Sequence, residues 1–384
     1  MIKNKIGCLL WLLLAMAVYV ADSSYWKAGI FVFSAAAVLG AKVFSLLAGK
    51  GLSVQIKLPR AGQKAKEFPV ILQIHNSSLL PVFYGVLFLE WKNCLTGESG
   101  KLKVPFAVSG RKHAEVSFQG KSRFCGCCVI AVKDYRIYDL FRIFYKKRKI
   151  TEKTAGILAV MPEVSPVSMD LMGKEAYDME SFRYSQNSSG DDPGEVFEIR
   201  EYRPGDNIKQ IHWKLTQKLG SPAVKESGYP VYDSVLLLAD MENVSGQVKD
   251  AAEQNAMAEV FASVAMALVD EGIPFEICFY DKIQQHLYLE RIESLEMCWN
   301  VLEAMMRSQG EKTEKATALY YLEEAADRSF AHYLYIAGEE FRQEADRLRE
   351  LGKVTQLCCG KTFKVTDNEI VFTAERWKEE LAGY

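Results

Sequence analysis

The sequence predicts a multidomain α+β protein with an N-terminal transmembrane helical hairpin, a β-sandwich-like middle domain and a C-terminal α/β domain. Three observations predict it: two apolar runs at the N-terminus, then short segments of alternating polarity, then strands that alternate with helices. At 384 residues, the chain is longer than one hydrophobic core usually organises. We expect a hairpin at 1–50, a β-sandwich-like domain at 51–150, a signature region with a strand-turn-helix motif at 151–230 and an α/β domain at 231–384.

The two apolar runs cover residues 6–21 and 28–49, and only Lys42 interrupts the second. Each is close to the about 20 residues that cross a hydrocarbon core. The polar turn between them contains Tyr25 and Trp26, which suit the membrane interface. Lysines lie outside both runs, so we expect a multi-pass protein of the cell membrane with its soluble domains in the cytoplasm. A cleaved signal peptide is the alternative for the first run, but the second run directly after it favours the hairpin.

The middle and C-terminal parts differ in their hydrophobic pattern. Residues 53–145 contain short alternating segments between turns rich in Gly, Ser, Asn and Pro, which is typical of a small all-β unit. A polar segment, residues 174–192, is expected to be mobile. From residue 234 onward, a buried-type strand is followed by a long helix at 250–270 and by further alternating strands and helices. This order predicts a mostly parallel sheet covered on both faces.

Composition argues against a nucleic-acid partner and against a disulfide framework. The net charge is -2, and no stripe of Lys and Arg is interleaved with aromatic residues, so we expect no nucleic-acid partner. The nine cysteines are an odd number and include two adjacent pairs, which argues against a disulfide framework. Cys125, Cys127 and Cys128 lack the paired spacing of structural zinc sites, so we expect burial rather than metal ligation.

The densest group of charged, aromatic and turn residues lies at residues 195–227. Residues 195–202 predict a strand, which a Pro-Gly turn follows. Asp206 is a good N-cap, so residues 207–218 predict a short helix that ends near Gly220. On such a helix, residue 209 shares a face with residues 212 and 213.

This stretch resembles the signature of the bacterial "domain of unknown function 58" family, which runs Arg-x-Tyr-x-x-Gly-Asp, then Ile-x-Trp, and later Val-Lys-Glu. Residues 133–144 and the following Val-x-Pro-like segment are similar to the family upstream of the signature. The resemblance implies a membrane-anchored protein with a β-rich middle domain and a von Willebrand factor A-like C-terminal domain. It also implies a MoxR-type AAA-plus ATPase as partner, and sometimes a transglutaminase-like membrane protein. The matching residues are Arg200, Tyr202, Arg203, Gly205, Asp206, Ile211, His212, Trp213, Val224, Lys225 and Glu226.

Two interpretations of this signature stay open. Its charged residues could form an ion-pair network that holds the helix against the sheet, or a surface that binds a partner. Large polar side chains are costly to order without a use, which supports the second interpretation. Lys209, where the family usually has arginine, belongs to the same surface. The partner-binding residues that we expect are Arg200, Tyr202, Arg203, Gly205, Asp206, Lys209, His212, Trp213, Lys225 and Glu226.

The sequence offers no catalytic motif and no complete metal site. It has no Gly-x-Ser-x-Gly elbow, P-loop or His-Glu-x-x-His helix, and His212 is expected to be a structural neighbour of Trp213. A metal-binding A-type domain needs Asp-x-Ser-x-Ser, whereas this chain has Asp240, Glu242 and Val244 there. We therefore expect no metal or cofactor and a non-enzymatic interaction or scaffold protein that acts with the ATPase in assembly or maturation of partner proteins. The alternative is a divalent-metal-dependent ligand-binding protein of the A-domain type.

Overall fold

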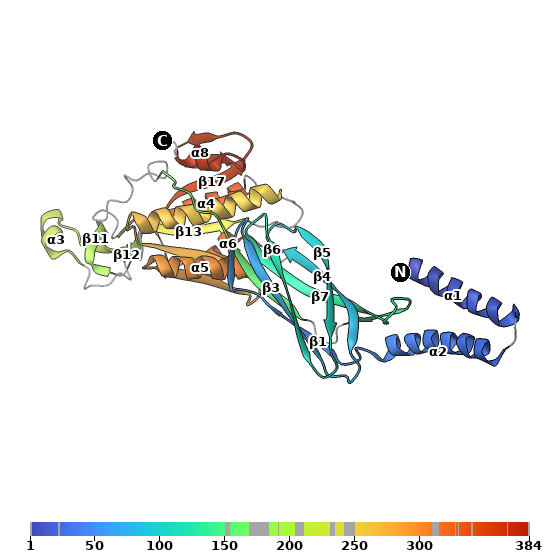
Figure 1. Cartoon of the computed structure of the whole chain (residues 1–384). Coiled ribbons are helices and arrows are strands. Elements are labelled where there is room, and N and C mark those ends of the chain that lie inside the picture. The colour runs from blue at the N-terminus through green and yellow to red at the C-terminus, as the bar shows by residue number, and fades with distance from the viewer. Residues whose placement is uncertain are drawn as a thin grey trace. The chain divides into compact units, whose positions relative to one another are not determined.

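The computed structural model divides into two compact units (Figure 1). The first unit comprises Met1–Asn93, Gly97–Ser122 and Cys128–Leu158, and the second comprises Cys94–Thr96, Arg123–Cys127 and Ala159–Tyr384. The structure describes residues 2–21, 24–149, 154–168, 184–190, 192–203, 211–230, 235–241, 250–308, 315–326, 328, 330–338, 341–366 and 368–382.

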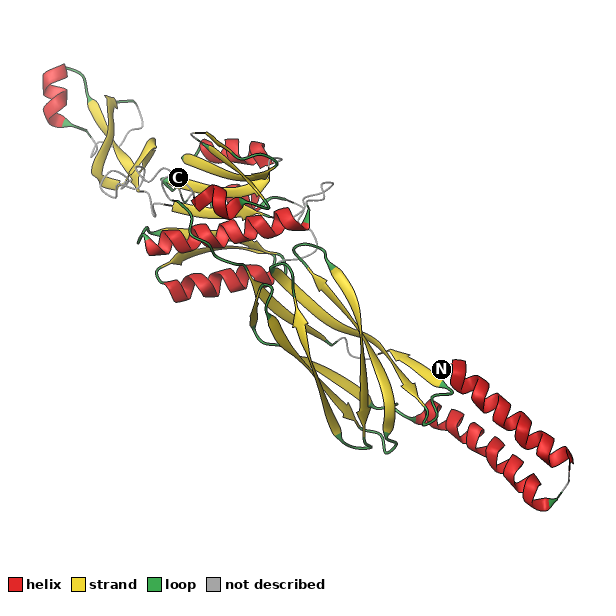
Figure 2. Ribbon diagram, turned by 45° about the horizontal axis from the view of Figure 1, so that its top comes forward, coloured by secondary structure: helices red, strands yellow, loops and turns green. Residues whose placement is uncertain are grey.

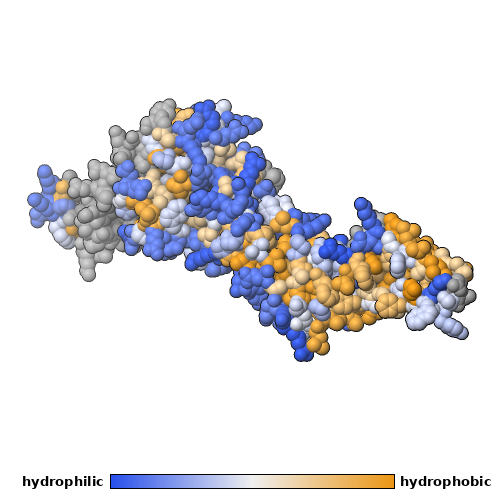
Figure 3. Space-filling model, viewed as in Figure 1, coloured by the Kyte–Doolittle hydropathy of each residue, from blue (hydrophilic) through white to orange (hydrophobic). Residues whose placement is uncertain are grey.

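The first unit begins with the two apolar helices that the sequence predicts, α1 (Ile2–Ala21) and α2 (Tyr25–Leu47). By length and composition, both are able to cross a membrane. Their apolar side chains are largely exposed, which Figure 3 shows as a hydrophobic surface over this pair. The Trp11 indole donates to Ser34 Oγ at 3.2 Å, and Tyr19 stacks on Phe31, so the helices pack against each other as a hairpin.

The rest of the first unit is built from two sheets that lie against each other (Figure 2). Alternate residues of β3, such as Val70, Leu72 and Ile74, are fully buried, as are Leu87 and Leu89 of β4. This alternation is that of strands with one face on a core, so the predicted β-rich middle domain is confirmed. The first sheet has the order β1 (Leu52–Lys57), β3 (Glu67–Asn76), β6 (His113–Lys121). The second has the order β2 (Ala61–Gln63), β9 (Ala155–Met161), β7 (Gly126–Tyr138), β4 (Val82–Asn93), β5 (Ser99–Val108), and β8 (Tyr145–Lys149) also pairs with β7.

The second unit contains a seven-stranded sheet whose five inner strands are parallel and whose two edge strands are antiparallel to their neighbours. Every residue of β13 and β16 is buried, as expected for inner strands covered on both faces. The predicted, mostly parallel sheet is therefore confirmed. The order is β15 (His286–Ile292), β14 (Phe275–Asp281), β13 (Val235–Asp240), β16 (His332–Gly338), β17 (Lys353–Gly360), β19 (Glu369–Thr373), β18 (Lys364–Thr366).

Helices cover both faces of this sheet. One core contains Leu237 of β13 with residues of α4, α5 and α8, and the other contains Leu238 with residues of α6 and α7. Successive residues of a strand point to opposite faces, so these two cores lie on opposite sides. The predicted long helix is α4, and Asp250 and Glu253 form a capping box at its start. The helices are α4 (Ala251–Asp270), α5 (Leu295–Ser308), α6 (Thr317–Glu324), α7 (Arg342–Arg349) and α8 (Trp377–Ala382).

A separate three-stranded sheet in the second unit has the order β10 (Tyr184–Gly190), β12 (Ala223–Pro230), β11 (Asp192–Glu201), and α3 (Trp213–Leu219) lies between β11 and β12 in the chain. Both outer strands run antiparallel to β12. Of the segment at residues 174–192 that is expected to be mobile, Tyr184–Gly190 form β10 and pair with β12, and residues 174–183 and 191 lie outside the described residues.

Buried His332 predicts a pH dependence of stability. Its side chain is buried against one face of the sheet, and its Nε2 is 2.8 Å from Thr355 Oγ1. Burial, assisted by the charge of Lys353, lowers the pKa of His332 to about 3. An unfolded histidine titrates near pH 6.5, so at pH 5 the unfolded chain binds a proton that the folded chain does not. The free energy of unfolding should therefore fall as the pH drops below 6.5, and His332 alone should contribute a loss of about 2 kcal/mol between pH 7 and pH 5.

Denaturant unfolding of the purified chain at pH 7 and pH 5 measures this loss. We expect His332→Gln to remove about 2 kcal/mol of the pH dependence. His286→Gln is the control, because the His286 ring is exposed on β15 of the same unit. A His332→Gln chain that keeps the wild-type difference between the two pH values would contradict the assignment.

Candidate functional site

The predicted signature residues lie on β11, α3 and β12. Arg200 of β11 pairs with Val224 of β12, and Lys225 and Glu226 follow Val224 along the same strand. The Tyr202 side chain is half-buried, and its backbone N–H donates to the carbonyl of Pro222 at 2.8 Å. Arg203 is exposed. Gly205, Asp206 and Lys209 lie outside the described residues.

The short helix of the signature begins later than the sequence predicts. Ile211 bridges to Val224, and the His212 backbone N–H donates to the carbonyl of Ala223 at 2.8 Å. Residues 211 and 212 are therefore paired with β12, so a helix at 207–218 capped by Asp206 is wrong at its start. The predicted end near Gly220 is confirmed, because Gly220 adopts a left-handed conformation with φ 74°.

His212 has a structural role at the start of α3. It is the N-cap residue, and its Nδ1 accepts a hydrogen bond from the Leu215 backbone N–H at 3.3 Å. Its carbonyl oxygen accepts the Thr216 hydroxyl at 3.1 Å, and that hydroxyl oxygen accepts the Ala223 N–H at the same distance. These bonds tie both ends of the helical turn to β12, so α3 is a fixed element. His212 therefore has a structural role, as the sequence predicts.

Trp213 is the first residue of α3, and 62% of its surface is exposed. Lys214 and Lys218 on the same helix are exposed as well. Exposed tryptophan is a side chain that protein interfaces favour, whereas exposed lysines are also typical of a solvated face. The alternative is an ion-pair network that holds the helix against the sheet. Several residues of that network lie outside the described residues, so this alternative stays open.

A second polar group lies at the carboxyl end of β13. Asp240 is buried, and its Oδ1 accepts the Thr317 backbone N–H at 2.6 Å. Its Oδ2 accepts the Ala318 N–H at 3.3 Å and the Tyr335 hydroxyl at 2.7 Å. The N-cap residue of α6, Ala316, has no side chain that can accept these N–H groups. Asp240 therefore anchors the N-terminus of α6 from 77 residues away.

This end of β13 is a topological switch point, because the chain leaves β13 toward β14 on one side and later returns to β16 on the other. Lys282, directly after β14, is partly buried; burial lowers its pKa to about 8, although the charge of Asp240 acts in the opposite direction. Burial and the nearby Asp240 raise the pKa of Tyr335 well above its usual value, so its hydroxyl stays protonated and donates.

Asp240 does not fit the role of a divalent-metal ligand. Both of its carboxylate oxygens accept hydrogen bonds from protein donors, and Lys282 brings positive charge toward it. Glu242 and Val244 lie outside the described residues. Within the part of the chain that the structure describes, no group of three or more His, Cys, Asp or Glu side chains could hold a metal ion. Cys125, Cys127 and Cys128 are buried, which confirms the expected burial.

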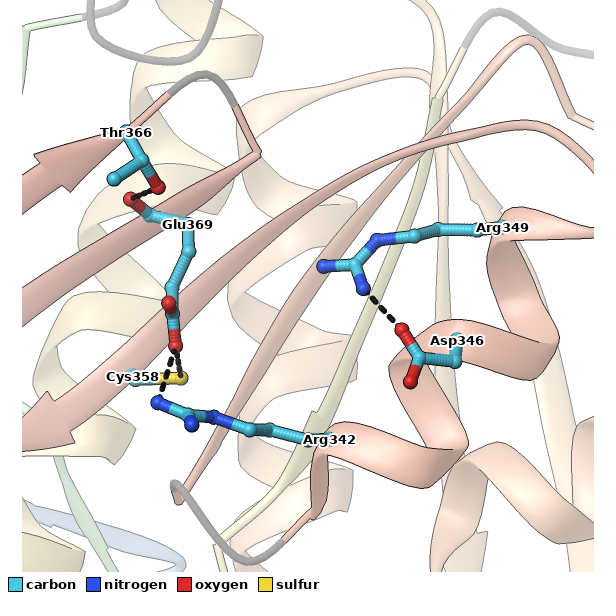
Figure 4. A network of polar contacts seen from close by, with 6 residues as sticks. All are labelled: Arg342, Asp346, Arg349, Cys358, Thr366 and Glu369. Atoms are coloured by element: carbon cyan, nitrogen blue, oxygen red, sulfur yellow. Dashed lines mark hydrogen bonds and ion pairs between the residues drawn. The ribbon is translucent and has the colours of Figure 1, made fainter.

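A third polar cluster joins α7 to the last strands of the sheet (Figure 4). Arg342 of α7 pairs with Glu369 of β19 at 3.3 Å, and the Cys358 thiol points at the same carboxylate oxygen at 3.6 Å. On α7, Arg349 also pairs with Asp346. The Arg342 side chain is 61% exposed, so this pair contributes little to stability. The cluster connects α7 with β17 and β19, and its Cys358 thiol is buried.

A family model described as "Protein of unknown function DUF58" matches residues 198–336. No curated protein matches the chain. Among solved structures, the CARDB domain of the PF1109 protein from Pyrococcus furiosus, in complex with di-metal ions, is 13% identical and covers 29% of this chain and 94% of its own, with a TM-score of 0.22. A cohesin module from a Clostridium perfringens family 33 glycoside hydrolase is 13% identical over 29% of this chain and 96% of its own, with a TM-score of 0.23.

The family match runs from β11 through α3, β12 and β13 into β16. It therefore includes the exposed Trp213 and the buried Asp240, and most of the signature residues by which the sequence resembles the family. Through residues 198–336, about a third of the chain, this protein is similar to the family described as Protein of unknown function DUF58.

Proposed function

We propose that this chain is a non-enzymatic, membrane-anchored interaction or scaffold protein that acts with a MoxR-type AAA-plus ATPase in assembly or maturation of partner proteins. A transglutaminase-like membrane protein is a further proposed partner by the same family resemblance, which also supports a von Willebrand factor A-like fold for the C-terminal domain that contains the parallel sheet. The single observation that carries the proposal is the exposed Trp213 on α3, inside the family-matched region.

The proposed location is the cell membrane, with α1 and α2 crossing it and the other domains in the cytoplasm. Lys3 and Lys5 at the start of α1 and Lys50 after α2 put positive charge at both open ends of the hairpin. Cytoplasmic flanks of membrane helices carry such an excess of Lys and Arg. The hairpin supports this location by its length and composition.

The chemistry of the α3 surface defines the partner that it fits. Trp213 offers a wide, rigid apolar side chain, and the exposed Lys214 and Lys218 offer positive charge beside it. A complementary surface has an apolar pocket for the indole and acidic groups around that pocket. The bonds of His212 hold α3 in place before binding, so little order has to be gained on association.

The alternative of a divalent-metal-dependent ligand-binding protein requires Asp240 as a metal ligand. Asp240 is instead engaged by the N–H groups of Thr317 and Ala318 and by the Tyr335 hydroxyl. We therefore prefer the interaction protein. Calorimetric titration of the chain with Mg²⁺ or Ca²⁺ separates the two, because binding that Asp240→Asn abolishes would favour the metal-dependent protein.

Trp213→Ala should weaken the association with the ATPase. Loss of a central tryptophan costs about 2 kcal/mol of binding, or roughly a 30-fold rise in Kd. The midpoint of unfolding should stay unchanged, because most of the indole is already in solvent. The measurement is co-purification of the detergent-solubilised chain from its native membranes, with mass spectrometry to identify the ATPase, followed by Kd determination with the purified partners.

Lys214→Ala is the matched control, because Lys214 is an exposed neighbour on the same helix and its loss should change the Kd far less. A folded Trp213→Ala chain that retains the ATPase with wild-type affinity would remove α3 as the binding surface. Co-purification of other proteins without any AAA-plus ATPase would argue against the proposed partner itself.

A further inference from the structure

The loop between β7 and β8, residues 139–144, lies beside the open end of the α1–α2 hairpin. The Asn4 side-chain amide in the first turn of α1 donates to the carbonyl of Phe141 at 3.0 Å. The Arg148 guanidinium of β8 donates to the carbonyl of Leu46, near the end of α2, at 2.6 Å. The loop and β8 therefore contact the two helices at the same, open end of the hairpin.

The tip of this loop is apolar. Leu140 is 61% exposed and Phe141 is 53% exposed, whereas loop tips in contact with water are usually polar. Phe83, also half exposed, stacks on Phe44 of α2 with ring centroids 5.7 Å apart, and this extends the exposed apolar surface onto the hairpin. An exposed apolar surface that continues from a membrane helix is suited to lipid.

The loop conformation is fixed by Asp139. This buried side chain accepts the backbone N–H of Phe141 at 2.8 Å, that of Ile143 at 3.3 Å and that of Phe144. Within the loop, the Ile143 side chain is buried, whereas those of Leu140 and Phe141 are exposed. The apolar tip is thus a preformed feature, and it does not need to rearrange to meet a surface.

Positive charge accompanies the apolar tip. Residues 140–149 contain five basic residues and no acidic one. Arg142, Lys146 and Lys149 are exposed, whereas Lys147 pairs with Asp134 at 2.8 Å. Exposed cations beside inserted apolar side chains are the arrangement that binds anionic lipid headgroups.

A groove between the helices continues the same apolar surface. Its volume is about 750 Å³, and Phe141 and Ile143 line it together with residues of both helices, among them Trp11, Ile30 and Phe33. An acyl chain that enters beside the loop tip can therefore lie along the hairpin. This continuity selects a lipid, rather than a soluble protein, as the occupant of the surface.

We propose that residues 139–144 and strand β8, together called the basic edge, bind the anionic phospholipid surface from which the hairpin emerges. Leu140 and Phe141 insert at the boundary of headgroups and acyl chains, and Arg142, Lys146 and Lys149 contact the phosphate groups. The inference rests on the proposed membrane location of the hairpin, and it adds a second, peripheral attachment that holds the β domain against the membrane.

Photocrosslinking of the full-length chain in nanodiscs tests the proposal. The nanodiscs contain equal amounts of phosphatidylglycerol and phosphatidylcholine, and photoreactive benzoylphenylalanine replaces one residue at a time. Leu140 is the test position, and Phe33, 76% exposed on α2, reports whether the hairpin is in the bilayer. Leu102 is the negative control, because it is an exposed leucine that pairs with Leu89, roughly 20 Å along β4 from Phe83.

We expect lipid adducts at Leu140 and Phe33 and none at Leu102. Adducts at Phe33 without adducts at Leu140 overturn the basic edge while leaving the hairpin in the membrane. An absence of adducts at Phe33 overturns the membrane location and the inference with it. Crosslinks from Leu140 to a protein instead of lipid would also overturn the proposal.

The charge requirement is tested by the ratio of the two lipids in the Leu140 adduct. We expect phosphatidylglycerol to exceed phosphatidylcholine at least about threefold, and the ratio to fall toward one after Lys146→Glu with Lys149→Glu. Lys101→Glu with Lys103→Glu makes the same change of charge on exposed β5 residues and should leave the ratio unchanged. Equal adducts of both lipids in the wild-type chain would overturn the anionic preference.

Discussion

Asp240→Ala is expected to lower the free energy of unfolding of the second unit by about 4 kcal/mol. The substitution removes the acceptor of three hydrogen bonds at once, from the N–H groups of Thr317 and Ala318 and from the Tyr335 hydroxyl. All of these donors are buried, and a buried donor without an acceptor costs about 1–3 kcal/mol. The loss exceeds that of an ordinary surface substitution because α6 also loses the negative charge at its N-terminus.

Denaturant unfolding of the detergent-solubilised chain, followed by fluorescence and circular dichroism, measures this loss. Tyr335→Phe serves as the companion variant, because it removes one donor and should cost about 1 kcal/mol. The double variant should be less destabilised than the sum of the two, since both changes break the same bond. An Asp240→Ala chain with wild-type stability would show that Asp240 does not anchor α6.

Arg328→Ala should lower the free energy of unfolding by about 3 kcal/mol. Glu276 lies on β14 with only 2% of its side chain exposed, and Arg328 Nη2 is 2.6 Å from its Oε1. Without the guanidinium, the buried Glu276 carboxylate loses the cation that lies 2.6 Å from its Oε1. Arg328 itself is 38% exposed, so the cost comes from the buried Glu276 carboxylate that loses its cation.

The control for this prediction is Arg376→Ala. Arg376 pairs with Glu379 at 3.2 Å, but both side chains are about 70% exposed, so its loss should cost less than about 0.5 kcal/mol. The comparison is made by thermal and denaturant unfolding of both variants. Similar losses for the two variants would mean that burial of Glu276 does not determine the strength of its pair.

Local hydrophobic patterns account for the parts of the fold that were predicted. Two apolar runs indicate α1 and α2, alternation indicates strands such as β3, and a continuous apolar run indicates β13. In each case the signal lies within one segment. The burial of Cys125 was also predictable, since a cysteine without a metal or disulfide pattern behaves as a small apolar residue.

Contacts between distant segments account for what was missed. Asp206 looks like an N-cap in sequence, yet His212 caps α3 because Ile211 pairs with Val224. Asp240 was considered as a metal ligand, and no local pattern indicates that it binds the N–H groups of α6. At the candidate site, the sequence identified Trp213 but not its exposure, which depends on how β11, β12 and α3 assemble.

The separation of Asp240 from its partners also affects the order in which the chain folds during synthesis. Its bonds reach 77 residues ahead to Thr317 and 95 residues ahead to Tyr335, so they form only after most of the second unit has left the ribosome. The helices α1 and α2 emerge long before that point. Both apolar helices are therefore complete while the parallel sheet is still unfinished, and the inner strand β13 gains its second neighbour only when β16 has been synthesised.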